Sequence, residues 1–136
     1  MKILVLGSGG REHALLHWLS KDENIAKLWV SPGNGGTGDL AESVEFSDNS
    51  FEEIFSFCKQ RGIDFLIPGP EQPLVDGIAD YFSSKQSETF VLGPHKSGAM
   101  LEASKSFSKE FMRQYKVPYA KSRSFDAHNL DEAYAF

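Results

Sequence analysis

The chain has 136 residues and a mass of 15.1 kDa, close to the size of one domain, since a single hydrophobic core usually organises roughly 100–150 residues. Its 40% hydrophobic and 24% charged residues are typical of a globular protein and disfavour collagen-like repeats, coiled coils and disorder. The 14 Lys and Arg against 19 Asp and Glu give a net charge of −5, which argues against nucleic acid as a partner, because a phosphate backbone requires clustered cations.

The cysteine count and the N-terminus indicate a cytoplasmic protein. Cys58 is the single cysteine of the chain, so no internal disulfide is possible and a reducing compartment is the simplest inference. The apolar run 3–6 is shorter than a signal-peptide core of roughly 7–15 residues or a membrane span of about 20. We therefore expect no membrane segment.

Short apolar runs and helical spacings alternate along the first part of the chain. Apolar runs predict strands at residues 2–6, 27–30, 43–46, 65–67 and 90–92. Helical spacing predicts helices from Arg11 onward, from Ser50 to Gly62, and over 74–82, the second with a capping box formed by Ser50 and Glu53. Cys58 lies on the apolar face of that second helix, which predicts a core position.

This alternation predicts an α/β fold: a doubly wound, mostly parallel, Rossmann-like sheet of five strands with helices on both faces. After residue 96 the pattern changes to two helices in tandem over 97–116, stopped at Pro118, followed by a strand at 122–125 and a helix that begins after Asn129. We expect three parts: an α/β domain over 1–95, a helical linker over 96–118, and the truncated beginning of a second unit over 119–136.

The most distinctive local feature is the stretch Gly7-Ser8-Gly9-Gly10-Arg11-Glu12-His13 at a strand-to-helix turn. Glycines let a ligand approach the backbone, and the free N–H groups at a helix start favour an anion. A dinucleotide fingerprint would place a third glycine at position 12 and an acidic residue near the end of the second strand, and neither is present. NAD or FAD binding is therefore disfavoured, and a tight turn without a ligand stays open as an alternative.

Two further loops, 31–38 and 69–73, also follow predicted strands. Ligands of an open parallel sheet bind outside the carboxyl ends of the strands, so these loops and the 7–10 turn should meet at one crevice that takes a small anionic or sugar-like ligand. Glu71 would accept hydrogen bonds there from sugar hydroxyls or an amine, or would only cap a helix. His13 is a candidate acid, base or ligand with an equally plausible structural role.

Other classes of chemistry find no support in the sequence. His17, His95 and His128 show no metal-site spacing with Cys58 or with carboxylates, so we predict no metal site. Neither a phosphate-loop motif nor a serine-hydrolase elbow occurs. Lys105 and Lys109 share one face of a predicted helix, which composition alone would interpret as a solvated surface.

The amino-acid sequences of four motifs resemble those of the phosphoribosylamine–glycine ligase family. They are Gly-Ser-Gly-Gly-Arg-Glu-His-Ala at 7–14, Pro-Gly-Asn-Gly-Gly-Thr at 32–37, Gly-Pro-Glu-Gln-Pro-Leu at 69–74 and Leu-Glu-Ala-Ser-Lys-Ser-Phe-Ser-Lys at 101–109. The resemblance covers the whole chain but only the front of the family's polypeptide: its N-terminal (pre-ATP-grasp) domain and the start of the ATP-grasp region. It implies the ATP-dependent joining of glycine to 5-phosphoribosylamine in purine biosynthesis.

The resemblance also implies roles for single residues. Gly7, Gly9, Gly10, Arg11, Asn34 and Glu71 would contact phosphoribosylamine, and Lys105 would point toward nucleotide phosphate. ATP and magnesium would be held mainly by regions absent from this chain, which should be inactive alone and carry no catalytic residue, and the full-length protein should be a monomer. Two alternatives remain: the front domain of another ATP-grasp ligase or carboxylase, and a stand-alone nucleotide-binding module.

Overall fold

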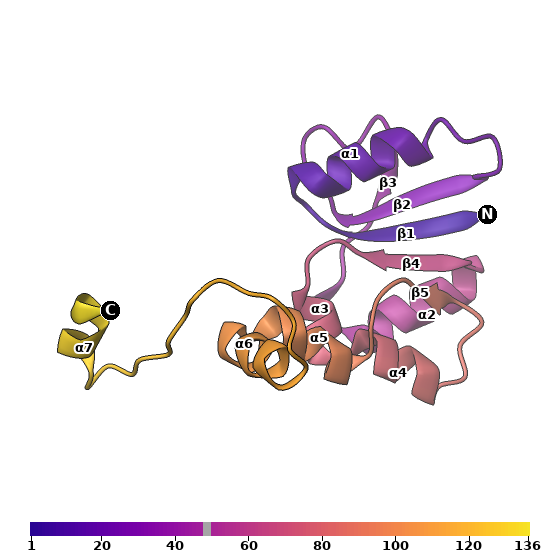
Figure 1. Ribbon diagram of the computed structural model, residues 1–136. Helices are drawn as coiled ribbons and strands as arrows, with labels where there is room; N and C mark the ends of the chain where they lie inside the picture. The colour runs from indigo at the N-terminus through magenta and orange to yellow at the C-terminus, as the bar shows by residue number, and fades with distance from the viewer. Residues whose placement is uncertain (48–49) are drawn as a thin grey trace. The chain divides into compact units, whose positions relative to one another are not determined.

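The computed structural model describes residues 1–47 and 50–136 (Figure 1). The chain divides into two units, residues 1–99 and residues 100–136. None of the described helices combines the length and the apolar composition that crossing a bilayer requires.

The first unit is built on a five-stranded sheet in the order β3-β2-β1-β4-β5, in which every neighbouring pair is parallel. Its strands are β1 (Lys2–Gly7), β2 (Lys27–Pro32), β3 (Glu42–Ser43), β4 (Phe65–Pro68) and β5 (Phe90–Val91). The central position of β1 follows from its nearly continuous apolar sequence, because a strand covered on both faces needs no polar side. The predicted sheet is confirmed, although β3 is shorter than expected and begins one residue earlier.

Helices cover both faces of this sheet. α1 (Gly10–Leu19) lies on one face, and α2 (Phe51–Arg61) and α4 (Ile78–Ser84) lie on the other, with α3 (Gln72–Asp76) directly after β4 (Figure 1). α5 (Lys96–Ala103) follows β5. The doubly wound arrangement is the one that the alternating strand and helix patterns predict.

Alternation along β1 divides the hydrophobic core in two. Leu4 and Leu6 pack with residues of α2 and α4, whereas Ile3 and Val5 pack with Leu16 of α1. The first cluster also contains Trp29, Ile54, Cys58, Ile63, Leu66, Ile78 and Phe82, and the second Leu28, Val30 and Ala41. Cys58 is buried, as predicted, and burial raises the pKa of its thiol to about 12.

The ends of α2 follow the predicted signals with one difference. The Ser50 hydroxyl accepts a hydrogen bond from the Glu53 N–H, and Gly62 ends the helix in the left-handed region at φ 62°. The Glu53 carboxylate, however, accepts from the N–H of Ser47 rather than from that of Ser50. Only one half of the predicted capping box therefore forms.

The single helix predicted over 74–82 is wrong, because Gly77 separates α3 from α4. Gly77 adopts φ 101°, a left-handed conformation that glycine reaches without strain, and its N–H is bonded to the carbonyls of Pro73 and Leu74. The spacing of apolar residues is helical on both sides of Gly77, so the sequence pattern does not reveal the break.

Asp80 connects α4 to the start of α5. Its carboxylate accepts a hydrogen bond from the Lys96 N–H at 2.7 Å, and this bond lowers the pKa of Asp80.

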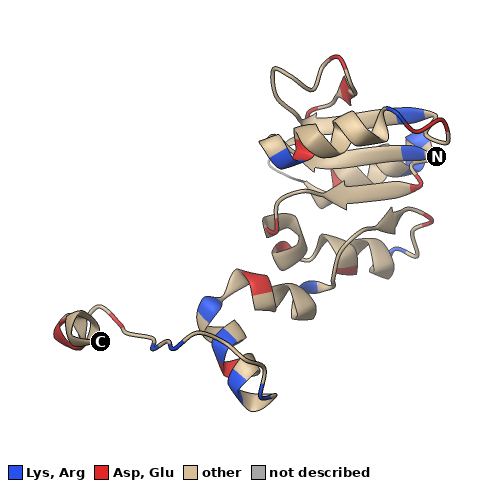
Figure 2. Ribbon diagram, turned by 45° about the horizontal axis from the view of Figure 1, so that its top comes forward, with Lys and Arg blue, Asp and Glu red and all other residues tan. Residues whose placement is uncertain are grey.

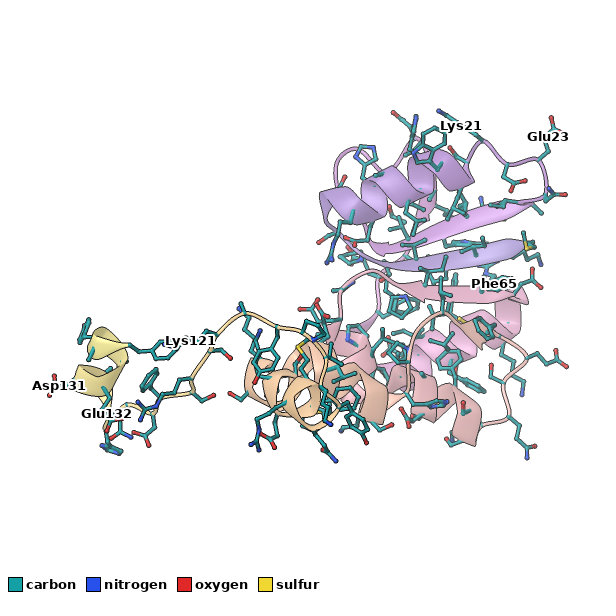
Figure 3. The ribbon with its side chains drawn as sticks, viewed as in Figure 1. Lys21, Glu23, Phe65, Lys121, Asp131 and Glu132 are labelled. Carbon is teal, nitrogen blue, oxygen red and sulfur yellow. The ribbon has the colours of Figure 1, made fainter. Side chains whose placement is uncertain are left out.

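The second unit contains α6 (Lys105–Gln114) and α7 (Leu130–Ala135). The tandem helices predicted over 97–116 are confirmed as α5 and α6, but residues 122–125 form no strand. Asp131 and Glu132 lie in the first turn of α7 (Figure 3), where negative charge is favourable. Asn129 precedes this helix as predicted, but its side chain makes no capping hydrogen bond.

Candidate functional site

A cavity of about 640 Å³ opens at the carboxyl ends of β1 and β4 in the first unit. The strand order reverses between these two strands, which is where open α/β sheets bind their ligands. The cavity is lined by Leu6, Gly7, Ser8, Gly9, Glu12, Ser31, Pro32, Phe51, Pro70, Gln72, Pro73, Asp76 and Tyr81. Parts of all three predicted loops therefore border one cavity, as their positions after parallel strands indicate.

The turn between β1 and α1 is held by the side chain of Glu12. Gly9 is the N-cap of α1, and its N–H donates to Oε2 of Glu12 at 2.6 Å. Glu12 is only 5% exposed, although a buried carboxylate is costly unless it is hydrogen-bonded. A helix N-terminus favours a nearby negative charge, and at the Gly9 N–H this charge is the carboxylate of Glu12 rather than that of a ligand.

Glu12 also explains why glycines surround it. A Cβ atom at Gly7 would lie 2.7 Å from Cγ of Glu12, and one at Gly69 would lie 2.5 Å from its Cδ, both closer than real contacts allow. Gly7 further adopts φ 129°. The glycine that a dinucleotide fingerprint requires at position 12 is replaced here by a side chain that fills the space between two loops.

Asn34 joins the loop after β2 to the loop after β1. Its Nδ2 donates to the carbonyl of Ser8 at 2.8 Å, and its Oδ1 accepts from the N–H of Gly36 at 2.8 Å. The hydroxyl of Thr37, a buried residue, accepts from the Asn34 N–H at 2.9 Å. The amide of Asn34 therefore braces the loops in this structure, and its side chain does not line the cavity.

His13 packs against the same loop. A Cβ atom at Gly36 would lie 2.5 Å from Cε1 of the His13 ring, so the glycine leaves room for the imidazole. His13 is half-buried on α1 and is not among the residues that line the cavity. These contacts correspond to the structural role that the sequence left open for it.

The residues predicted to bind substrate lie at or around the cavity with different degrees of access. Gly7 and Gly9 line it, whereas Gly10, the first residue of α1, and Arg11 do not. Glu71 is exposed beside the lining residues Pro70 and Gln72, and its carboxylate makes no capping bond to α3. Glu71 therefore occupies the N-cap position of α3, as the alternative role predicts, but caps the helix only through its backbone carbonyl, which accepts from the N–H groups of Leu74 and Val75.

Sequence patterns did not single out Phe51, Asp76 and Tyr81, which also line the cavity. They come from α2, α3 and α4, and no local motif marks them. The Asp76 carboxylate accepts from Nε2 of Gln72 at 2.8 Å. With Glu12 and Asp76 present and no Lys or Arg among the described lining residues, the cavity offers acceptors rather than cations.

Lys105 belongs to the second unit. It is the first residue of α6, whose N-cap Ser104 accepts a hydrogen bond from the Phe107 N–H. Figure 2 shows Lys and Arg recurring along α6, and Lys109 lies over the ring of Tyr119 at 5.1 Å. Farther along the helix, a hydrogen bond from Arg113 lowers the pKa of Glu110.

Within residues 1–47 and 50–136, no group of three or more His, Cys, Asp or Glu residues is arranged to hold a metal ion.

The first unit, which contains the cavity, matches a known protein family. The family model described as "Phosphoribosylglycinamide synthetase, N domain" matches residues 1–102. The chain belongs to this family. The resemblance inferred from the four motifs is thereby confirmed.

Named relatives of this synthetase family agree. The chain is 44% identical over 128 residues to a phosphoribosylamine–glycine ligase of Caldanaerobacter subterraneus, covering 94% of this chain and 30% of the relative. It is 43% identical to the ligase of Clostridium acetobutylicum, covering 93% and 30%. The chain thus spans about 30% of the length of these curated relatives.

Solved structures share the fold. The crystal structure of phosphoribosylamine–glycine ligase from Thermotoga maritima matches with a TM-score of 0.66 and 25% identity, over 99% of this chain and 30% of that one. The biotin carboxylase domain of Hydrogenobacter thermophilus 2-oxoglutarate carboxylase, solved with MgADP and bicarbonate, matches with a TM-score of 0.66 and 19% identity, over 97% and 31%. The carboxylase likeness, at this identity, concerns the fold alone.

Proposed function

We propose that this chain is the N-terminal part of an ATP-dependent ligase that joins glycine to 5-phosphoribosylamine, and that the cavity at β1 and β4 receives the ribosylamine. Membership of the synthetase N-domain family supports this, as does identity of 38–44% to proteins named phosphoribosylamine–glycine ligase. The likeness to carboxylases is much lower in identity, at 19–20% for those of 2-oxoglutarate and pyruvate, which favours the ligase over a carboxylase front domain.

The proposed reaction has two steps. ATP transfers its terminal phosphoryl group to the carboxylate of glycine, which gives an acyl phosphate and ADP. The amine of phosphoribosylamine then attacks the acyl carbon, a C–N bond forms, and phosphate leaves as the amine loses a proton, so the products are glycinamide ribonucleotide, ADP and phosphate. The contribution of this chain would be to hold the amine and ribose in place for that attack.

The observation that carries the proposal is the chemistry of the cavity. Its volume of about 640 Å³ falls within the roughly 300–1,000 Å³ typical of small-molecule sites. Residues of the glycine turn and the acidic residues Glu12 and Asp76 line it, and their carbonyl and carboxylate oxygens are of the kind that accepts hydrogen bonds from hydroxyls and amines. Such a surface favours the hydroxyl- and amine-bearing part of the sugar over its phosphate.

We propose matching roles for the residues that the resemblance indicates. Gly7, Gly9 and Gly10 would let the sugar approach the backbone, and the exposed carboxylate of Glu71 would accept from a hydroxyl or the amine at the cavity rim. Arg11 and Asn34 would act from the surrounding loops. Lys105 would face nucleotide phosphate, with ATP and magnesium held mainly by regions outside this chain.

The wider setting of the proposal follows the same expectations. Residues 1–95 would form the substrate domain, 96–118 a helical linker and 119–136 the beginning of the ATP-grasp region. A buried, reduced Cys58 supports a cytoplasmic location, and we expect the full-length ligase to be a monomer.

Calorimetric titration of the chain with ribose 5-phosphate, ATP and NAD tests the proposal. We expect ribose 5-phosphate to bind and ATP and NAD to bind at least roughly tenfold more weakly, because the cavity presents acceptors and holds Glu12 where a dinucleotide site has glycine. Tight binding of NAD would contradict the ligase assignment.

Glu71→Gln makes the test specific to one side chain. Removing its charge should weaken ribose 5-phosphate binding by roughly threefold to tenfold, since a hydrogen bond to a charged acceptor is about twice as strong as a neutral one. Glu23→Gln provides the matched control, because Glu23 is another exposed carboxylate of the first unit, located in the loop between α1 and β2 (Figure 3). Equal effects of the two variants would show that Glu71 does not contact the sugar.

A further inference from the structure

The side chain of Glu12 occupies an unusual place for a carboxylate. It is 5% exposed, it accepts one hydrogen bond from the Gly9 N–H at 2.6 Å, and it borders the cavity. Its other side faces the loop after β4, where a Cβ atom at Gly69 would lie 2.5 Å from Cδ of Glu12. One carboxylate therefore contacts both turns that form the walls of the cavity.

Helix capping accounts for only part of this arrangement. Glu53 occupies the same third position of α2 and also accepts a backbone N–H that precedes its helix, that of Ser47 at 2.8 Å. Glu53 is exposed, so this type of cap does not require burial. Burial of Glu12, and its fit against Gly69, need a separate explanation.

We propose that Glu12 is a positioning residue of the cavity, whose carboxylate sets the spacing between the turn at 7–10 and the turn at 69–73. The carboxylate fixes the backbone of the first turn through the Gly9 N–H and fills the space that a side chain at position 69 would take. Position 69 is glycine because Glu12 is there. The link to sugar binding rests on the proposed function, whereas the contact between the two turns does not.

A double-mutant cycle without ligand tests the contact. We expect Gly69→Ala to lower the folding equilibrium constant, measured by urea unfolding, by at least roughly tenfold in the presence of Glu12, and by much less in a Glu12→Ala background, because the overlapping carboxylate is gone. The same factor in both backgrounds would overturn the proposal.

Glu12→Gln provides a second measurement if Glu12→Ala does not fold. Glutamine keeps the shape but removes the charge, so the amide proton resonances of Gly9 and Gly69 should both shift, and the Gly9 amide should exchange faster with solvent. Glu53→Gln, the matched control, should shift resonances around Ser47 and leave Gly9 and Gly69 unchanged. An unchanged Gly69 resonance in Glu12→Gln would overturn the proposal.

Binding of ribose 5-phosphate then connects the contact to function. Loss of the carboxylate between the two turns should misplace the groups that hold the sugar, so Glu12→Ala should weaken binding by roughly tenfold or more, and Glu12→Gln should restore most of it. Glu53→Ala should leave the affinity unchanged. Wild-type affinity in Glu12→Ala would overturn the positioning role. Absence of ribose 5-phosphate binding to the wild-type chain would instead count against the proposed function, and the double-mutant cycle would then test the contact between Glu12 and Gly69 by itself.

Discussion

The two units of the chain contrast in what their helices bury. In the first unit, strands and helices enclose a core on each face of the sheet, and side chains such as Phe82 are almost fully buried. In residues 100–136 no described residue is buried, and Phe107, Tyr115 and Tyr134 are 44%, 61% and 88% exposed. Apolar content alone therefore does not make a core; a partner element is also needed.

The helices α2 and α6 show the difference at close range. Each is preceded by an N-cap serine, Ser50 or Ser104, whose hydroxyl accepts a hydrogen bond from the N–H three residues later. α2 then buries Ile54 and Cys58, whereas α6 buries none of its residues although its two faces differ strongly in polarity. A serine N-cap thus marks the start of both helices, whereas burial against other elements follows in α2 and not in α6.

The largest expected effect is on the core of the first unit. Phe82→Ala should lower the free energy of unfolding by about 3–5 kcal/mol, because it leaves a cavity beneath the sheet. Phe111 in α6 is 36% exposed, so Phe111→Ala should cost less than about 1 kcal/mol. Urea unfolding of the two variants measures both, and equal losses would abolish the contrast between the units.

A glycine in the loop after β2 tests whether loops of the first unit are specified as strictly as its core. Gly33 adopts φ 75°, and a Cβ atom there would lie 2.6 Å from the hydroxyl of Thr37, so Gly33→Ala should cost about 2–3 kcal/mol. Gly35→Ala is the control, because a Cβ atom at Gly35 meets nothing within 4 Å. Thermal unfolding measures the stability that each variant loses, and equal losses in Gly33→Ala and Gly35→Ala would refute the prediction.

Cys58 makes the stability of the first unit sensitive to alkaline pH. Burial raises the pKa of its thiol from 9.0 to about 12, so between these values the unfolded chain loses this proton while the folded chain keeps it. The protonated Cys58 thiol therefore contributes its full share of the free energy of unfolding below about pH 9. Above that pH, this contribution falls by about 1.4 kcal/mol per pH unit. Urea unfolding of the wild-type chain between pH 8 and 11 should show a steeper loss than unfolding of Cys58→Ala, and parallel curves would contradict the assignment.

The smallest effect is expected at the start of α6. Ser104→Ala removes the hydroxyl that accepts the Phe107 N–H, which should cost about 1 kcal/mol of local helix stability. Chemical shifts of residues in α6 should move toward coil values, while the unfolding midpoint of the first unit stays constant. A lower midpoint for the first unit would show that the units are coupled.

Much of the sheet could be predicted because its signals are local. An apolar run such as 2–6 ending in glycine is sufficient to place β1, and the rule that parallel strands share their carboxyl edge is sufficient to bring three loops together. The break at Gly77 could not be predicted, since a single glycine within a helical pattern costs only about 1 kcal/mol and its left-handed conformation depends on the surrounding packing.

The candidate site was predicted only in outline for a similar reason. The motif identified the glycines of the turn, and the acidic residue at position 12 marked a departure from the dinucleotide pattern. Its burial against Gly69, however, depends on a contact between residues far apart in sequence. Asp76 and Tyr81 reach the cavity only because Gly77 redirects the chain between them.

The alternation along β1 limits how the gene can change. Because Ile3 and Val5 face one core and Leu4 and Leu6 the other, inserting or deleting one codon within this strand would exchange the two sets of side chains. The same shift would displace Gly7, Gly9 and Glu12 relative to the strand end. Length variation should therefore be excluded from β1 and its turn, and should instead be tolerated in surface connections such as the one between α1 and β2.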